Sequence, residues 1–462
     1  MLPPSTVAAL VGASRTRWFR AVAGVGALAV GASYLFHPTA YRIDLEVYRA
    51  GGRAWLDGVD LYAQPFPTQI GHPLSFTYPP ISAVLLSPLA WLPLSVANAV
   101  WAVLTIALVV GTLMLLLQLV GVRARSPQWW WLLAAAFALT ARLEPVRSTM
   151  GYGQVNVAIM ALVAADCVLR RTPWPRGALV GLVAAVKLTP AVFVLYFLVR
   201  KDYKAAATAA ASGALVSAIG FVLAPSDSVQ YWTTTIFETD RIGQLTYSSN
   251  QNIRGVLARF GLMGSTASVL WVLLSLVTVA VGVLAMRRAQ RAALPALVLV
   301  LNGVIGLLIS PVSWSHHWVW AVPGLLVLVL VVLATRSRAA TVLGVLGFAV
   351  FAIAPQWRLP NDNTSGVEVS WAVWQKVVGN GYVWWGAALL VVCAFVADRW
   401  GPVPVAPTPA TEPAGTPARP PGMSADDLGT HQRAHDDMGT HQRAHDDMGT
   451  HQRAHDDMGT HQ

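Results

Sequence analysis

Long apolar runs separated by short polar segments make up most of this chain. Many of the runs approach the roughly 20 residues that an α-helix needs to cross the hydrocarbon core of a bilayer. The ten clearest runs cover residues 19–36, 97–121, 128–142, 154–169, 203–224, 266–286, 293–309, 316–335, 339–355 and 382–398. This pattern predicts an all-α bundle of membrane-spanning helices.

Two further apolar stretches are harder to assign. Residues 80–93 are short and broken by proline, and residues 177–199 are interrupted by Lys187-Leu188-Thr189-Pro190. Proline disrupts a helix, and broken backbone is tolerated within a membrane where it lines a cavity. We therefore predict that 177–199 is a hairpin of two half-length segments. The bundle then has about twelve transmembrane segments, some of them short or broken.

Basic clusters give the predicted bundle an orientation. They lie at residues 15–20, 123–125, 170–176, 200–204, 287–291 and 336–338. Cytoplasmic loops collect Lys and Arg, and with the hairpin every cluster falls on one side. Both termini are then cytoplasmic. The extracytoplasmic segments are 37–96, 143–153, 225–265, 310–315 and 356–381, and they hold nearly all acidic residues of the body.

Composition agrees with a polytopic membrane protein. Of the 462 residues, 55% are hydrophobic and only 12% are charged, against about 25% charged in soluble domains. The formal net charge of +10 does not indicate nucleic acid as a partner, because cytoplasmic loops of membrane proteins are basic. Cys167 and Cys393 each lie in an apolar run, so a disulfide framework is not expected.

The chain divides into two parts at about residue 400. Residues 1–400 form the predicted membrane domain. Residues 401–462 begin with a proline-rich stretch and continue with the ten-residue repeat "GTHQRAHDDM". Such a composition predicts a disordered cytoplasmic tail. Weak metal binding by its histidines is the less favoured alternative.

The first polar feature follows the first apolar run. Asp44 lies in "YRIDLEVYRAGG", just outside the predicted first membrane helix. It is either a solvated loop charge or a general base that takes a proton from a hydroxyl group. Tyr48 shares a helical face with Asp44, whereas Glu46 points elsewhere and is expected to act as a supporting or solvated charge.

Two short motifs place polar groups at the membrane boundary. "FTYPP" ends the first outer loop, and Tyr78 there marks either a simple turn or a sharp entry into the membrane. "GYGQVN" opens a membrane helix with Gln154 and Asn156, which either cap the helix or face a cavity, where amides suit sugar hydroxyls. Glu144 and Arg147 flank the same loop and could pair with each other.

Lys187 lies within an otherwise apolar stretch. A lysine at that depth costs several kcal/mol unless it is paired or hydrated. A buried cation that faces a cavity suits a lipid phosphate. The alternative is an ion pair with an internal acid.

Two outer segments complete the candidate site. "SSNQNIRG" carries Asn250 and Asn252, which could cap the following helix, and Arg254, which could bind phosphate. "SPVSWSHHW" carries Trp314, His316 and His317. Adjacent histidines without further ligands in a spacing motif are a weak metal signal. Hydrogen bonding to phosphate or sugar is the preferred interpretation, and no nucleotide or zinc motif is present.

The ordered motifs "DLEVY", "YPP", "GQVN", "KLTP", "NQN" and "SPVSWSHH" resemble those of the actinobacterial polyprenol-phosphate-mannose-dependent α-mannosyltransferases, membrane enzymes of the GT-C fold class. The resemblance covers about residues 19–398. Where relatives commonly have "NQS", this chain has "NQN", which leaves the role of Asn252 open.

The resemblance implies a bacterial cell-membrane enzyme with an extracytoplasmic active site. Its donor would be polyprenyl-phosphate-mannose and its acceptor an acylated phosphatidylinositol tetramannoside, to which it adds an α-(1,2)-linked mannose. Asp44 matches the essential carboxylate of the first outer loop. The reaction would invert the anomeric centre, with Lys187 and His316 or His317 stabilising the phosphate and with no metal or other cofactor.

Two alternatives remain at this point. One is a related lipid-phosphate-sugar transferase, either a mannosyl- or an arabinofuranosyltransferase, that acts on lipomannan or lipoarabinomannan. The other is a lipid flippase or transporter, which favours internal repeats and a binding site at the bilayer midplane. The membrane part has no evident sequence repeat, and its polar residues gather on one face, so the enzyme is favoured.

Overall fold

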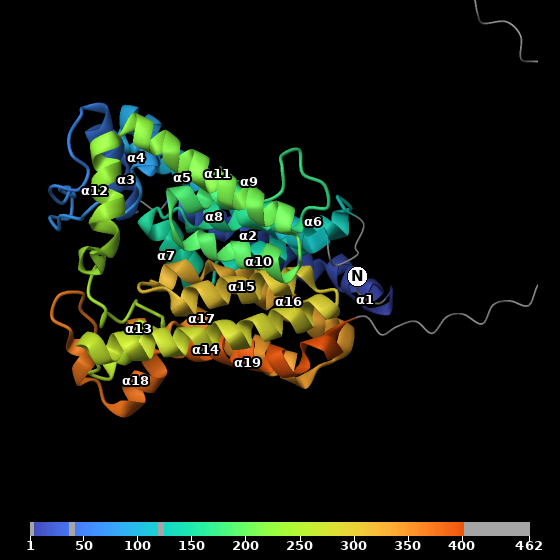
Figure 1. The fold of residues 1–462 in the computed structure, drawn as a ribbon. Helices are drawn as coiled ribbons and strands as arrows, with labels where there is room; N and C mark the ends of the chain where they lie inside the picture. The colour runs from blue at the N-terminus through green and yellow to red at the C-terminus, as the bar shows by residue number, and fades with distance from the viewer. Residues whose placement is uncertain (1–3, 37–41, 119–123, 402–462) are drawn as a thin grey trace, which may run out of the picture. The chain divides into compact units, whose positions relative to one another are not determined.

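The computed structural model describes residues 4–36, 42–118 and 124–401, and within these ranges the chain is helical (Figure 1). Pairing of extended backbone in this part is limited to two isolated bridges. The α-helices are α1 (Pro4–Arg15), α2 (Arg17–Phe36), α3 (Ile43–Leu56), α4 (Pro80–Leu86), α5 (Leu94–Leu117), α6 (Pro127–Thr140), α7 (Glu144–Tyr152), α8 (Asn156–Val168), α9 (Ala178–Val186), α10 (Val194–Val199), α11 (Tyr203–Leu223), α12 (Pro225–Thr233), α13 (Ile253–Arg259), α14 (Gly264–Arg291), α15 (Pro295–Ile309), α16 (Ala321–Thr335), α17 (Arg338–Ile353), α18 (Val373–Gly379) and α19 (Gly381–Val396). Short 3-10 helices include η1 (Ser87–Trp91), η3 (Thr189–Phe193), η6 (Ser315–Trp320) and η7 (Pro355–Arg358). The predicted tail lies almost wholly outside the described residues.

Seven helices of the described part are long and apolar enough to cross a membrane. An eighth span results if α7 and α8, which are bent by 117°, count as one. The protein is therefore a multi-pass membrane protein, as predicted, and its described part is all-helical. The count of about twelve segments is not confirmed. One reason is length, because α6 has 14 residues and α15 has 15, fewer than the roughly 20 that a full crossing takes.

The predicted break in residues 177–199 is present. Lys187 has extended backbone (φ −147°, ψ 124°) between α9 and η3. Arg176, which precedes α9, and Tyr196, in α10, both donate hydrogen bonds to the carbonyl of Cys167, at 3.3 and 3.0 Å. The segment thus enters and leaves at the same end of the bundle, which is the predicted hairpin, with Lys187 at its turn.

Contacts between distant segments gather the basic helix ends at one end of the bundle. They join Arg200 to Gln290 (2.7 Å), Arg288 to Asp398 (3.1 Å) and Ser337 to Trp400 (3.0 Å). In Figure 1 these helix ends lie toward the right, beside α1. The shared end agrees with a common side for the basic clusters.

The opposite end carries a small second core outside the long helices. It joins α3, the loop that follows α3, and α12, through Val47, Leu61, Tyr62, Phe76 and Tyr231. The glycine pair of α3 makes this packing possible. A Cβ atom on Gly51 would lie 2.5 Å from the Phe76 ring, and one on Gly52 would lie 2.7 Å from the Cα of Ser87. This close packing sets the position of α3, and with it Asp44.

Candidate active site

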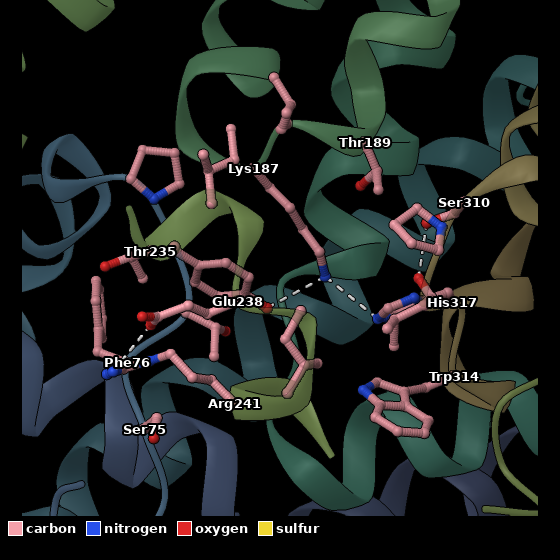
Figure 2. Close-up of a pocket in the computed structure, with 18 of the residues that line it drawn as sticks. Ser75, Phe76, Lys187, Thr189, Thr235, Glu238, Arg241, Ser310, Trp314 and His317 are labelled. Carbon is pink, nitrogen blue, oxygen red and sulfur yellow. Dashed lines mark hydrogen bonds and ion pairs between the residues drawn. The ribbon is translucent and has the colours of Figure 1, made fainter. Parts of the chain in front are cut away.

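A cavity of about 620 Å³ opens between this outer region and the helical bundle. Its walls come from α3, the loop before α4, the hairpin turn, residues 231–242, α14, α15 and the segment before η6. Seven predicted site residues line it, namely Asp44, Tyr48, Tyr78, Gln154, Lys187, Trp314 and His317. Figure 2 shows Lys187 and His317 close to each other in this space, while the side chains of Glu238 and Arg241 meet each other at another part of the wall.

Asp44 is the second residue of α3, and its partly buried side chain faces the cavity. Burial raises the pKa of Asp44 to about 6, although a hydrogen bond from the Gln154 side chain and the positive charge of Lys187 both lower it. A carboxyl group with this pKa is mostly ionised at pH 7 and is more basic than an ordinary aspartate. It is therefore suited to accept a proton from a hydroxyl group.

Two phenols orient the amide that holds Asp44. The hydroxyl groups of Tyr48 and Tyr78 donate to Oε1 of Gln154, at 2.9 and 3.2 Å, and lie 3.0 Å from each other. Because the phenols use the carbonyl oxygen of the amide, its nitrogen remains to donate to the carboxylate of Asp44. Tyr48, Tyr78 and Gln154 thus act together to position Asp44.

Lys187 lies at the other end of the same hydrogen-bonded chain. Its Nζ atom lies 3.1 Å from the Tyr78 hydroxyl, 3.1 Å from Oδ1 of Asn156 and 3.4 Å from Nε2 of His317. Lys187 takes part in none of the ion pairs among the described residues. The residue is only 8% exposed. The ammonium group is surrounded by neutral partners, so a bound anion would find an uncompensated positive charge.

The sharp bend between α7 and α8 brings Gln154 to α3. Gly153 adopts φ +74° at this bend, a conformation that favours glycine. A Cβ atom there would lie 2.8 Å from the Cβ of Leu45 and 2.9 Å from the Cβ of Arg42. Arg42 also donates to the carbonyl of Met150, at 3.2 Å, which holds α7 against the start of α3.

The two adjacent histidines have different surroundings. His317 lines the cavity beside Lys187. His316 is buried against Tyr152, with 5.2 Å between ring centroids, and its carbonyl accepts a hydrogen bond from Asn156 at 3.1 Å. The geometry therefore brings His317, rather than His316, to the space that an anion beside Lys187 would occupy.

Besides Asn156 and His316, three predicted residues lie outside the cavity wall. The carboxylate of Glu46 accepts from the backbone of the first outer loop. Asn250 is fully buried, and its Oδ1 accepts from the backbone N–H of Ser313 at 3.0 Å. The guanidinium of Arg254 lies over the ring of Trp271, 5.5 Å from its centroid, and only the tryptophan reaches the cavity.

Glu144 is a site-organising residue that the sequence argument missed. It does not pair with Arg147 among the described ion pairs, and it is only 4% exposed. Its carboxylate accepts hydrogen bonds from Ser148 (2.6 Å), Ser315 (2.8 Å), Trp357 (2.8 Å) and Tyr382 (2.7 Å). Because Ser315 directly precedes the two histidines, this contact fixes the turn that carries His317.

Glu238 and Arg241 are two further cavity residues that the sequence did not indicate. Both line the cavity, and their side chains form an ion pair at 3.4 Å. They lie in the long outer segment after α12, where no recognisable motif marked them.

No group of three or more His, Cys, Asp or Glu side chains able to hold a metal ion occurs in the part of the chain that the structure describes. The histidines of the repeat tail lie outside that part. That catalysis needs no metal stays a prediction.

Comparison with protein families gives a match over about half of the chain. Residues 76–311 match the model of glycosyltransferase family 87. This range includes Tyr78, Gln154 and Lys187, whereas Asp44 and His317 lie outside it.

Curated relatives cover most of the chain. The chain is 46% identical over 376 residues to the polyprenol-phosphate-mannose-dependent α-(1-2)-phosphatidylinositol mannoside mannosyltransferase of Mycolicibacterium smegmatis. This match covers 78% of the chain and 84% of the relative. The chain is 44% identical to the protein of the same name from Mycobacterium tuberculosis, over 80% of this chain and 88% of the relative. A second M. smegmatis protein, a phosphatidylinositol pentamannoside mannosyltransferase with the same donor in its name, is 33% identical over 80% of this chain and 87% of the relative. No solved structure matches the chain significantly.

Proposed function

This chain belongs to glycosyltransferase family 87, and we propose that it is a polyprenol-phosphate-mannose-dependent α-(1-2)-mannosyltransferase acting on a phosphatidylinositol mannoside. The names of two relatives at 44–46% identity support the donor, the linkage and the acceptor class. They give no support to an arabinofuranosyl donor, a lipomannan acceptor or lipid transport. The structural observation that carries the proposal is one cavity lined by a basic carboxylate, Asp44, and an unpaired ammonium, Lys187.

The acceptor in this proposal is an acylated phosphatidylinositol tetramannoside, which becomes the pentamannoside. The chain is more similar to the two phosphatidylinositol mannoside enzymes, at 46% and 44%, than to the pentamannoside enzyme, at 33%. That difference favours the shorter acceptor.

Asp44 acts as the general base in this mechanism. The 2-hydroxyl group of the acceptor mannose donates to Asp44 and attacks the anomeric carbon of the donor. Its proton passes to the carboxylate as the new carbon–oxygen bond forms. Gln154, held by Tyr48 and Tyr78, keeps the carboxylate in place. Attack from the face opposite the phosphate inverts the anomeric centre.

Lys187 acts on the leaving group. As the bond between the anomeric carbon and the phosphate oxygen breaks, its electron pair stays with the polyprenyl phosphate. The ammonium of Lys187 and the imidazole of His317 are 3.4 Å apart and can bind this developing charge together. Because the leaving group is already a phosphate, the mechanism requires neither a strong acid nor a metal ion.

The membrane arrangement follows from the same proposal. The predicted topology, with the hairpin, places the basic end and both termini in the cytoplasm. The cavity then lies near the extracytoplasmic surface, where the sugar headgroups of both lipid substrates are found. Membrane lipids are the other partners, and nucleic acid is not one.

The test is a transfer assay with purified protein in liposomes. Polyprenyl-phosphate-mannose and the tetramannoside lipid should give the pentamannoside, with an α-(1-2) linkage in the product. A chain that transfers mannose only to the pentamannoside or to lipomannan would refute the proposed acceptor. A folded chain that transfers no mannose to any of them would refute the proposed activity.

A further inference from the structure

Four charged residues line the cavity, and they form two groups. Asp44 and Lys187 belong to the reaction centre, linked through Gln154 and Tyr78. Glu238 and Arg241 form the second group, which lines the same cavity, and Figure 2 shows their side chains meeting each other away from Lys187. The proposed reaction gives this second pair no task.

Arg241 is built into the framework of the cavity. Its Nη2 atom donates to the carbonyl of Tyr62 at 2.8 Å, and the Tyr62 hydroxyl donates to the carbonyl of Tyr78 at 2.7 Å. The pair is therefore held at a fixed place relative to Tyr78, whose own hydroxyl contacts Lys187. A surface ion pair without such anchoring would adopt several side-chain conformations.

The pair also has unused hydrogen-bonding capacity. The Nε atom of Arg241 is buried and has no partner among the described residues. The ion-pair distance of 3.4 Å is long for a charge-assisted hydrogen bond, which is usually below about 3 Å. The side chain of Glu238 is 39% exposed and that of Arg241 is 23% exposed, so a ligand in the cavity can reach both.

We propose that Glu238 and Arg241 form a second sugar subsite, which binds the mannose units of the acceptor that do not react. This inference rests on the proposed function. A carboxylate accepts hydrogen bonds from adjacent hydroxyl groups, and a guanidinium donates to them, so the pair fits a neutral polyol. The partly exposed ring of Trp314 also lines the cavity and offers a face on which a sugar can pack.

Charge and size both favour the acceptor over the donor at this place. The opposite charges of Glu238 and Arg241 cancel, and the carboxylate would repel a phosphate. The donor phosphate belongs beside Lys187, which has no acidic partner within the described ion pairs. A cavity of about 620 Å³ lies in the size range of drug-sized ligands, about 300–1,000 Å³, and so exceeds the needs of one sugar ring.

The test compares steady-state kinetics of wild type and Glu238→Gln with two acceptors. One is the tetramannoside lipid, and the other is a simple alkyl α-mannoside, which lacks the additional mannose units. For the tetramannoside we expect the acceptor KM to rise about tenfold, while kcat and the donor KM stay within about twofold. The alkyl mannoside should be used equally well by both proteins.

Arg241→Gln should give the same pattern, and Glu238→Gln keeps the proposal testable if loss of the Tyr62 contact unfolds the arginine variant. The matched control is another outer ion pair, Arg53 in α3 and Asp57 directly after it, which are 3.9 Å apart and do not line the cavity. Arg53→Gln and Asp57→Asn should change neither the acceptor KM nor the donor KM. Equal losses with both acceptors, or no loss in Glu238→Gln, would overturn the subsite. Turnover of the tetramannoside by wild type tests the proposed function separately.

Discussion

The Nζ atom of Lys187 lies 3.1 Å from the phenol oxygen of Tyr78, and this contact joins the two ends of the reaction centre. Tyr78 also donates to Gln154, and Gln154 holds Asp44. One hydrogen-bonded chain therefore runs from the ammonium to the carboxylate. It sets the base and the phosphate-binding cation at a fixed separation, as a transfer between two lipid headgroups requires.

The pH dependence of transfer should report Asp44. Burial raises its pKa to about 6, and only the ionised form can accept a proton. We expect kcat/KM to fall about tenfold per pH unit below about pH 6 and to be level above about pH 7. Initial rates across this range test the expectation. If kcat/KM instead falls only near pH 4, the pKa of Asp44 is that of an ordinary carboxyl group.

The same pKa shift affects stability. The pKa of Asp44 is raised from 3.8 in the unfolded chain to about 6 in the folded one, so the folded state binds the proton more tightly. Folding stability should therefore fall as the pH rises from about 4 to about 6, by roughly 3 kcal/mol, and stay level above. Asp44→Asn should melt at a higher temperature than wild type at pH 7.5, with an advantage that shrinks toward pH 4. An advantage that does not vary with pH would contradict this account.

Replacing Lys187 should impair the departure of the phosphate. We expect Lys187→Gln to lower kcat by about 100- to 1,000-fold, the range found when one preorganised donor to a developing charge is removed. Inhibition by the product polyprenyl phosphate should weaken as well. Lys204→Gln, which removes an exposed lysine at the start of α11, is the control and should behave as wild type. A Lys187 variant with normal turnover and normal product inhibition would exclude a phosphate contact.

The bend at Gly153 offers a comparison within one motif. Gly153→Ala adds a Cβ atom that would lie 2.8 Å from Leu45 at φ +74°. It should displace Gln154 from Asp44 and cost about 1–3 kcal/mol of stability together with most of the activity. Gly151→Ala is the matched control, because a Cβ atom there meets nothing within 4 Å. Equal effects of the two substitutions, in thermal unfolding and in transfer, would show that the bend is not critical.

Glu144 should tolerate glutamine but not leucine. In Glu144→Gln the amide oxygen can keep three donors, while its nitrogen donates to the Tyr382 hydroxyl, which can reverse its role. Glu144→Leu leaves four donors without an acceptor and should cost roughly 3 kcal/mol or more. Melting temperatures and transfer rates of both variants test this. If glutamine is as damaging as leucine, the negative charge itself is needed.

Some features of the fold were predictable because their causes are local. Hydropathy marks the long helices, and the charge and proline of "KLTP" mark the break at Lys187. The number of spans was not predictable in the same way. α6 and α15 are shorter than a bilayer crossing, and residues 80–93 fold into a short α-helix and a 3-10 turn rather than a span.

The site was predictable as separate motifs but not as a network. Tyr48, Tyr78 and Gln154 each stood out, yet the bonds that join Gln154 to the two tyrosines connect positions 106 and 76 residues apart. Glu144 was missed because three of its four partners lie 171, 213 and 238 residues away. Glu238 and Arg241 were missed because the contact that anchors Arg241 joins it to Tyr62, which lies 179 residues away in the sequence.

The most direct test of the central claim is mannosyl transfer by wild type and Asp44→Asn in the same liposomes. Both proteins receive polyprenyl-phosphate-mannose and the tetramannoside lipid, with a chelator present to remove divalent metals. We predict the pentamannoside from wild type, and at least a thousandfold less from Asp44→Asn, whose melting temperature shows that it is folded. Near-normal product from folded Asp44→Asn would contradict the account, because another group would then have to take the proton.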